Sequence, residues 1–283
     1  MNEKSIPYLL VLPSTIFIFV VFLIPVFETI FLAFKDYENN WTTENFLIAY
    51  EDINFSKALR NTMLLLVAVV SIQTCLALGM AMMLTKIKNN RDIYLYIWTI
   101  PLGISDLAGG LAWLALLSET GYMNSVLNYL GVMDKPTLWL TYEKPLTLFI
   151  AVMLAEIWRS TAVVMIILVA GVQLIPKEYN EAAQVMGANS WQRFTKVTLP
   201  LLKPSLQTAL ILRTILALEV FAVVLALAGN DFRVLVQETY LWQFEYRETG
   251  VAAVYALIIF ALSIIATLFY LYVIRVRREA LTT

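Results

Sequence analysis

Six long apolar segments, separated by shorter polar ones, dominate the pattern of the chain. They run at about residues 8–34, 62–85, 93–117, 146–174, 205–228 and 251–274, and each contains at most two charged residues. A helix needs about 20 predominantly apolar residues to cross roughly 30 Å of hydrocarbon. The pattern therefore predicts an all-α membrane protein with six transmembrane helices. Pro13, Pro25 and Pro101 lie inside the first and third segments, and we expect kinks rather than split spans, because neighbouring helices can satisfy the freed carbonyl groups.

The composition supports a membrane location and removes several classes of chemistry. Hydrophobic residues make up 60% of the chain and charged residues 14%, against roughly 45–50% and about 25% in soluble domains. Histidine is absent and Cys75 is the single cysteine, which excludes histidine acid–base chemistry, His/Cys metal sites and an intramolecular disulfide. The carboxylates within the apolar segments are spread over four helices and form no evident catalytic cluster. We expect neither an enzyme nor a metal site.

Basic residues gather on one side of the predicted spans. Eleven of the 20 Lys and Arg residues lie there with five of the 21 acidic residues. These eleven are Lys4, Lys86, Lys88, Arg91, Lys177, Arg193, Lys196, Lys203, Arg275, Arg277 and Arg278. Such an excess marks the cytoplasmic side. We therefore expect a cell-membrane protein with both termini in the cytoplasm and with the segments 35–61, 118–145 and 229–250 outside. Residues 1–283 are expected to form one membrane domain.

The outward segment 118–145 contains a helical pattern. Met123, Val126, Leu127 and Leu130 have the i, i+3, i+4, i+7 spacing of one helical face. The pattern predicts a short helix, which either lies on the outer surface or packs against the spanning helices of its own loop.

The cytoplasmic segment 175–204 is far longer than a helical hairpin needs. Pro176 suits a first helical position, and Glu178 and Glu181 fall in the opening turns, where carboxylates favour the helix dipole. Gly187 can end this helix in the left-handed conformation. A second short helix then presents Trp191 on one face and ends at Leu199-Pro200. We expect a helix–turn–helix platform that contacts a partner protein.

Within this platform the chain resembles the permease subunits of binding-protein-dependent ABC importers. The family's mark reads here Glu181-Ala182-Ala183, Gly187 and Val197-x-Leu199-Pro200. The resemblance extends over nearly the whole chain and looks most like the first permease of the sugar-importing branch. It is carried further by Leu12-Pro13, Ala58-Leu59-x-Asn61-Thr62, Pro101, Glu156-x-Trp158-Arg159, Leu212-Arg213-Thr214 and Phe221.

This resemblance implies an importer complex for a sugar or oligosaccharide. Its other parts would be a second, related permease subunit, two cytoplasmic ATPase subunits that use ATP and Mg, and an extracytoplasmic solute-binding protein. The chain itself has no G-x-x-x-x-G-K-[ST] phosphate loop, so no cofactor is expected in it. The coupling residues implied are Glu181, Ala182, Ala183, Gly187, Leu199 and Pro200. An importer of another small solute and a proton-coupled secondary transporter remain alternatives.

Six ionisable residues lie within the apolar segments, where charges are costly and usually face a cavity or a partner. They are Glu28, Asp106, Glu156, Arg159, Arg213 and Glu219. Glu156 and Arg159 are three residues apart and can pair along one helical face, whereas Arg213 and Glu219 point in different directions. Glu156, Arg159, Arg213 and Glu219 are the candidates for the translocation path, with structural pairing as the alternative for each.

Overall fold

The computed structural model describes residues 6–87 and 89–275, so Lys4, Lys88, Arg277 and Arg278 of the charge count lie outside the described residues. The described residues are almost entirely helical, and their β-structure is limited to an isolated bridge between Lys35 and Trp41. They fall into two compact units. The first unit comes from residues 1–57 with 235–261, and the second from residues 58–234 with 262–283.

The first unit contains one continuous candidate span and a small polar cluster. Its helices are α1 (Ile6–Ile18), α2 (Ile24–Ala33), α3 (Glu44–Glu51), α14 (Leu235–Tyr240) and the first half of α15 (Thr249–Val273). Leu10–Ala33 is long and apolar enough to cross a membrane in spite of Pro13 and Pro25, so these two prolines do not split the span, as expected. Asp52, just after α3, accepts hydrogen bonds from the Tyr255 hydroxyl at 2.6 Å and from Trp242 Nε1 at 3.1 Å.

The second unit is built around α8, the long helix Pro145–Gln173. Its side chains Val152, Val164, Met165 and Leu168 are fully buried, and α6, α12 and α13 pack against it. The other helices are α4 (Phe55–Leu84, which begins in the first unit), α5 (Arg91–Thr99), α6 (Asp106–Leu117), α7 (Tyr122–Tyr129), α9 (Lys177–Val185), α10 (Ser190–Arg193), α11 (Leu199–Leu201), α12 (Lys203–Leu218) and α13 (Ala222–Ala228).

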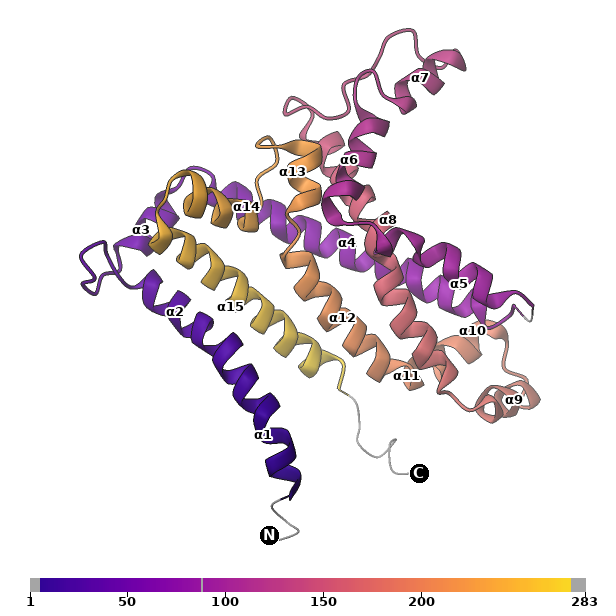
Figure 1. Cartoon of the computed structure of the whole chain (residues 1–283). Helices are drawn as coiled ribbons and strands as arrows, with labels where there is room; N and C mark the ends of the chain where they lie inside the picture. Colours follow the sequence, from indigo (N-terminus) through magenta and orange to yellow (C-terminus); the bar gives the residue numbers. More distant parts are fainter. Residues whose placement is uncertain (1–5, 88, 276–283) are drawn as a thin grey trace. The chain divides into compact units, whose positions relative to one another are not determined.

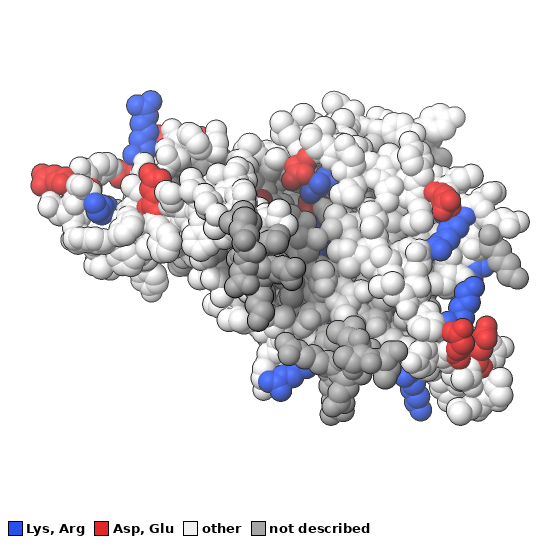
Figure 2. Space-filling view, turned by 60° about the horizontal axis from the view of Figure 1, so that its bottom comes forward, with Lys and Arg blue, Asp and Glu red and all other residues white. Residues whose placement is uncertain are grey.

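The described helices provide four candidate membrane spans, or up to six if each of two bent helix pairs counts as one span. Four long helices pass alone: Leu10–Ala33, Phe55–Leu84, Pro145–Gln173 and Thr249–Val273. Their outer surfaces are strongly apolar, and Figure 2 shows one face on which charged side chains form only a few small groups among uncharged residues. This surface is what a bilayer requires, because lipid tails cannot solvate charges.

The third apolar segment is bent, contrary to the expectation that Pro101 leaves its span intact. Arg91–Gly103 and Asp106–Tyr129 meet at 94°. Pro101 lies in a 3₁₀ turn at Ile100–Gly103, and the backbone is extended at Ile104 and Ser105. The hydroxyl of Ser105 then caps a new helix by accepting from the Ala108 amide at 3.3 Å. A proline followed by a good N-cap residue restarts the helix in a new direction.

The fifth apolar segment is also interrupted, so the continuous helix predicted over 205–228 is wrong. Helix α12 ends at Leu218 and α13 begins at Ala222. The break allows α13 to bury Val223 and Val224 in the core of this unit. At Gly110 of α6 an added Cβ would lie 2.7 Å from Ala226 Cβ, so α6 and α13 approach closely. Tertiary packing therefore outweighs continuation of the helix.

Helices α7 and α9 lie at opposite ends of α8 (Figure 1). With 29 residues and a rise of 1.5 Å per residue, α8 is about 44 Å long, enough to separate two membrane faces. Helix α7 confirms the helix predicted in 118–145. Its Met123 and Leu130 are exposed, and Asn124 anchors it through hydrogen bonds to the carbonyls of Glu119 at 3.0 Å and Thr137 at 2.9 Å.

Candidate functional sites: a buried ionic network and a helical loop

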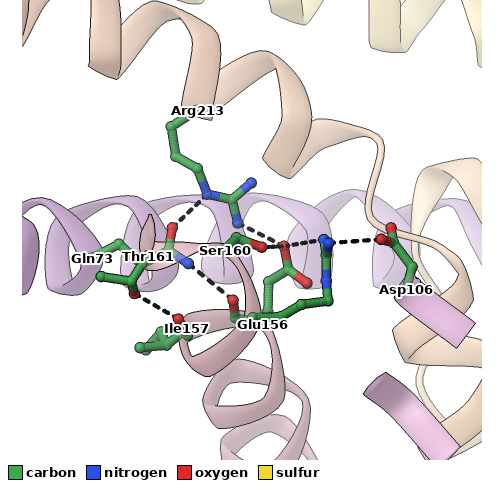
Figure 3. Close-up of polar contacts among 8 residues, drawn as sticks. Gln73, Asp106, Glu156, Ile157, Ser160, Thr161 and Arg213 are labelled. Atoms are coloured by element: carbon green, nitrogen blue, oxygen red, sulfur yellow. Dashed lines mark hydrogen bonds and ion pairs between the residues drawn. The ribbon is translucent and has the colours of Figure 1, made fainter. Parts of the chain in front are cut away.

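A buried ion pair joins α8 and α12. Glu156 and Arg213 are each only 1% exposed, and Arg213 Nη2 lies 2.7 Å from Glu156 Oε1 (Figure 3). The same carboxylate oxygen accepts a hydrogen bond from the Ser160 hydroxyl at 2.8 Å. A buried charge is tolerated when it is paired and hydrogen-bonded, and Glu156 meets this requirement through Oε1, whereas its buried Oε2 has no hydrogen-bond partner among the described residues.

Gln73 of α4 completes the buried part of the network. Its Nε2 donates to the main-chain carbonyl of Glu156 at 3.0 Å, and its Oε1 accepts from Arg213 Nε. The side chain is completely buried. Three helices are thereby joined by one set of polar contacts. The sequence analysis missed Gln73, although an amide in the middle of a long apolar segment is the signal that could have found it.

Arg159 carries the network toward the surface of this unit. Its Nη1 pairs with Asp106 Oδ1 at 2.8 Å, and its Nη2 approaches Glu156 Oε1 at 3.5 Å. The predicted pairing of Glu156 with Arg159 is therefore present, but the shorter contact of Arg159 is with Asp106. The Asp106 side chain is 49% exposed. Two cations and two anions thus form a chain that runs from a buried to an accessible end.

Glu219 lies apart from this network. It is the C-terminal cap residue of α12, at the break before α13, and it is exposed. Its carboxylate makes no hydrogen bond or ion pair with any residue that the structure describes. Arg213, six residues earlier, turns to α8 and α4, so the two side chains do point in different directions as expected. An unpaired carboxylate at a helix break is available to a polar ligand.

The segment after α8 folds into two short helices, as the sequence predicts. Helix α9 starts directly after Pro176 and ends in a left-handed turn at Gly187, where φ is +83°. The Gly187 amide donates to the Gln184 carbonyl at 3.0 Å, and the Ala188 amide donates to the Ala183 carbonyl at 2.9 Å. These two bonds form a Schellman motif, whose left-handed residue is usually glycine.

The second helix begins with a capping box and ends close to the predicted stop. The Asn189 side chain accepts from the Gln192 amide at 2.9 Å, and the Gln192 side chain accepts in return from the Asn189 amide. The helix ends at Leu201, one residue after the predicted stop at Leu199-Pro200, and the chain bends by 69° before Lys203. Pro200 directly follows the π-helical turn Phe194–Thr198 and Leu199.

The turn between α9 and α10 presents an apolar surface. Val185 and Met186 are 89% and 88% exposed, and Trp191 is 71% exposed. Glu181 and Ala182 are exposed beside them, whereas Ala183 is half-buried. Large apolar side chains gathered at one exposed turn mark a surface for protein contact.

Comparison with known proteins places the whole chain in one family. Residues 46–279 match the model of the binding-protein-dependent transport system inner membrane component. The trehalose/maltose transport system permease of Thermococcus litoralis is 31% identical, over 98% of this chain and 96% of its own length. The sulfoquinovosyl glycerol transport system permease of Agrobacterium fabrum is 29% identical, over 98% of this chain and 92% of its own length.

The fold is that of a permease of known structure. A chain of a bacterial ABC transporter involved in the import of the polysaccharide alginate superposes with a TM-score of 0.83 at 21% identity, over 97% of this chain and 96% of its own. The same transporter bound to an alginate-loaded periplasmic protein gives a TM-score of 0.84. Together with the family match, these likenesses show that the chain belongs to the inner-membrane permease components of binding-protein-dependent ABC importers.

Proposed function

We propose that this permease imports a sugar or oligosaccharide in an ATP-driven complex. Its relatives include permeases of trehalose/maltose, sulfoquinovosyl glycerol and trehalose transport systems. The complex would contain a second permease, two cytoplasmic ATPase subunits and an extracytoplasmic binding protein. Complex formation with a solute-loaded periplasmic protein is known for the alginate transporter of similar fold.

The loop 175–204 is proposed to couple ATP hydrolysis to the membrane helices. The observation that carries this assignment is the exposed turn at Val185 and Met186, held by Gly187 at the end of α9. In the proposal Glu181, Ala182 and Ala183 of α9 enter a groove of an ATPase subunit, since small side chains permit close approach. Leu199 and Pro200 lie at the end of the second loop helix, just before the bend into α12, so a displacement of α9 would reach a membrane helix through that bend.

The proposed orientation places this loop and both termini in the cytoplasm. It follows from the excess of Lys and Arg on that side. Helix α7, at the other end of α8, then faces outward, where the binding protein would deliver its solute.

The candidate path residues divide into two roles in this proposal. Glu219, exposed at the α12–α13 break, and the accessible pair of Arg159 with Asp106 contact the solute. The buried pair of Glu156 with Arg213 holds α8 and α12 in place around them. Charged groups form stronger hydrogen bonds to sugar hydroxyls than neutral groups, roughly twice as strong.

Uptake into proteoliposomes tests the proposed function. The complete complex is reconstituted with its binding protein, ATP is enclosed, and entry of radiolabelled trehalose and maltose is measured. We expect uptake that requires ATP and the binding protein and that survives a protonophore. Uptake that fails with the protonophore and persists without ATP would instead establish a secondary transporter. ATP-dependent uptake of amino acids but of no glycoside would refute the proposed cargo.

A further inference from the structure

A hollow of about 930 Å³ lies between the end of α4, the start of α5, the end of α8 and the helices α9 and α10. Four basic residues line it: Lys86, Arg91, Lys177 and Arg193. Glu181 is the single acidic residue among the lining residues. The hollow therefore carries an excess of positive charge, although the chain as a whole has a formal charge of -1.

The cations of the hollow lack anionic partners within the described part of the chain. None of the four takes part in an ion pair there. Arg193 donates only to the neutral oxygens of Gln184 at 3.1 Å and Ser190 at 3.2 Å. The Nε atoms of Arg91 and Arg193 are buried and have no hydrogen-bond partner. The two guanidinium groups thus carry positive charge that no described carboxylate neutralises.

Apolar side chains form much of the rest of the lining, beside the polar residues Thr85, Gln173, Asn180, Ser190 and Thr198. Ile87 lies three residues after the candidate span Phe55–Leu84, Val172 lies at the end of the span Pro145–Gln173, and Trp191 and Phe194 come from the loop. Trp191 and Phe194 lie with their ring centroids 5.7 Å apart. A free phosphate can use the cations and the polar groups but gains nothing from the apolar side chains. A molecule with a phosphate head and a hydrocarbon body matches both parts, and basic pockets between membrane helices are suited to anionic lipid headgroups.

We propose that this hollow binds the headgroup of an anionic phospholipid, with its phosphate at Arg91 and Arg193. The bound lipid would join α5 to α10 and so steady the loop beside the membrane. The proposal requires only the membrane location of the chain. It is tested on the permease itself, so its failure is distinct from a failure of the sugar or ATPase assignments.

Native mass spectrometry of the purified full-length chain in neutral detergent tests this proposal. Dioleoyl phosphatidylglycerol is the probe, and dioleoyl phosphatidylcholine is the neutral control lipid. We expect preferential retention of phosphatidylglycerol. The double variant Arg91→Gln with Arg193→Gln should bind it about 25-fold more weakly, because each basic residue near an anionic headgroup contributes roughly fivefold.

Two further variants make the result specific. Lys196→Gln with Lys203→Gln removes the same charge from exposed positions outside the hollow and should leave retention unchanged. Arg91→Lys with Arg193→Lys keeps the charge and should restore most of the binding. Equal retention of both lipids, equal loss in the two charge-removing variants, or complete displacement of the lipid by millimolar inorganic phosphate would each overturn the proposal.

Discussion

Removal of Arg213 should destabilise the fold sharply, because its partner would stay buried. Arg213→Met keeps much of the side-chain volume but deprives Glu156 of its 2.7 Å ion pair at 1% exposure. Breaking a buried pair on one side costs about 3–5 kcal/mol. Ser160 still donates to the carboxylate, and Arg159 lies 3.5 Å from it, so we expect the lower end, about 3 kcal/mol.

The double variant makes the reasoning quantitative. Glu156→Leu alone leaves Arg213 without its carboxylate and should also cost about 3 kcal/mol. With Arg213→Met added, both charges are gone and no buried ion remains unpaired. We therefore expect the double variant to lose about 3 kcal/mol or less, where independent effects would sum to about 6 kcal/mol.

The assay is unfolding in mixed micelles with increasing dodecyl sulfate, followed by tryptophan fluorescence. Lys203→Met is the matched control, since it removes an exposed cation from the same helix and should change stability by less than about 0.5 kcal/mol. If the two single variants are additive, or if Arg213→Met is as mild as the control, the buried pair does not hold α8 to α12.

Three further predictions concern the loop, the path and the orientation. Gly187→Leu forces a branched side chain into a left-handed conformation at a cost of roughly 1–2 kcal/mol, so uptake per assembled complex should fall. Gly187→Asn should retain uptake, and equal uptake in both variants would contradict the role of this turn. Glu219→Leu should lower uptake per assembled complex while Glu219→Gln retains assembly and basal ATPase activity, and normal uptake in the Leu variant would remove Glu219 from the path. In a Cys75→Ala background, a membrane-impermeant maleimide should label Asp231→Cys in intact cells and miss Glu178→Cys, and the reverse pattern would invert the proposed orientation.

The apolar pattern was sufficient to predict where helices form, but not where they bend. Segment length and hydropathy are local properties, and they located the long helices α4, α8 and α15. The bend at Pro101 depends on the Ser105 cap that follows it, and the break after Leu218 depends on burial of Val223 against other helices. Such contacts between distant segments are not encoded in the period of one segment.

The candidate site was predicted in part for the same reason. The turn at Gly187 depends on local backbone chemistry, which spacing reveals, and its positive φ confirms it. The charged residues of the network were found because a charge in an apolar segment is conspicuous. The pairing of Glu156 with Arg159 followed from their spacing, but the contacts between helices did not, since Gln73 is 83 positions from Glu156 and Asp106 is on another helix than Arg159. These contacts depend on the tertiary fold, which brings distant segments of the chain together.

Cross-linking from the turn of the loop tests the coupling assignment most directly. In a Cys75→Ala background, Met186→Cys is assembled with the ATPase subunits and treated with a short bismaleimide, with Val132→Cys at the other end of α8 as the matched exposed control. We predict a cross-link from position 186 to an ATPase subunit, with a yield that changes when ATP is added, and none from position 132. A cross-link from position 132 but not from position 186 would contradict the proposal that this loop contacts the ATPase subunit and couples ATP hydrolysis to the membrane helices.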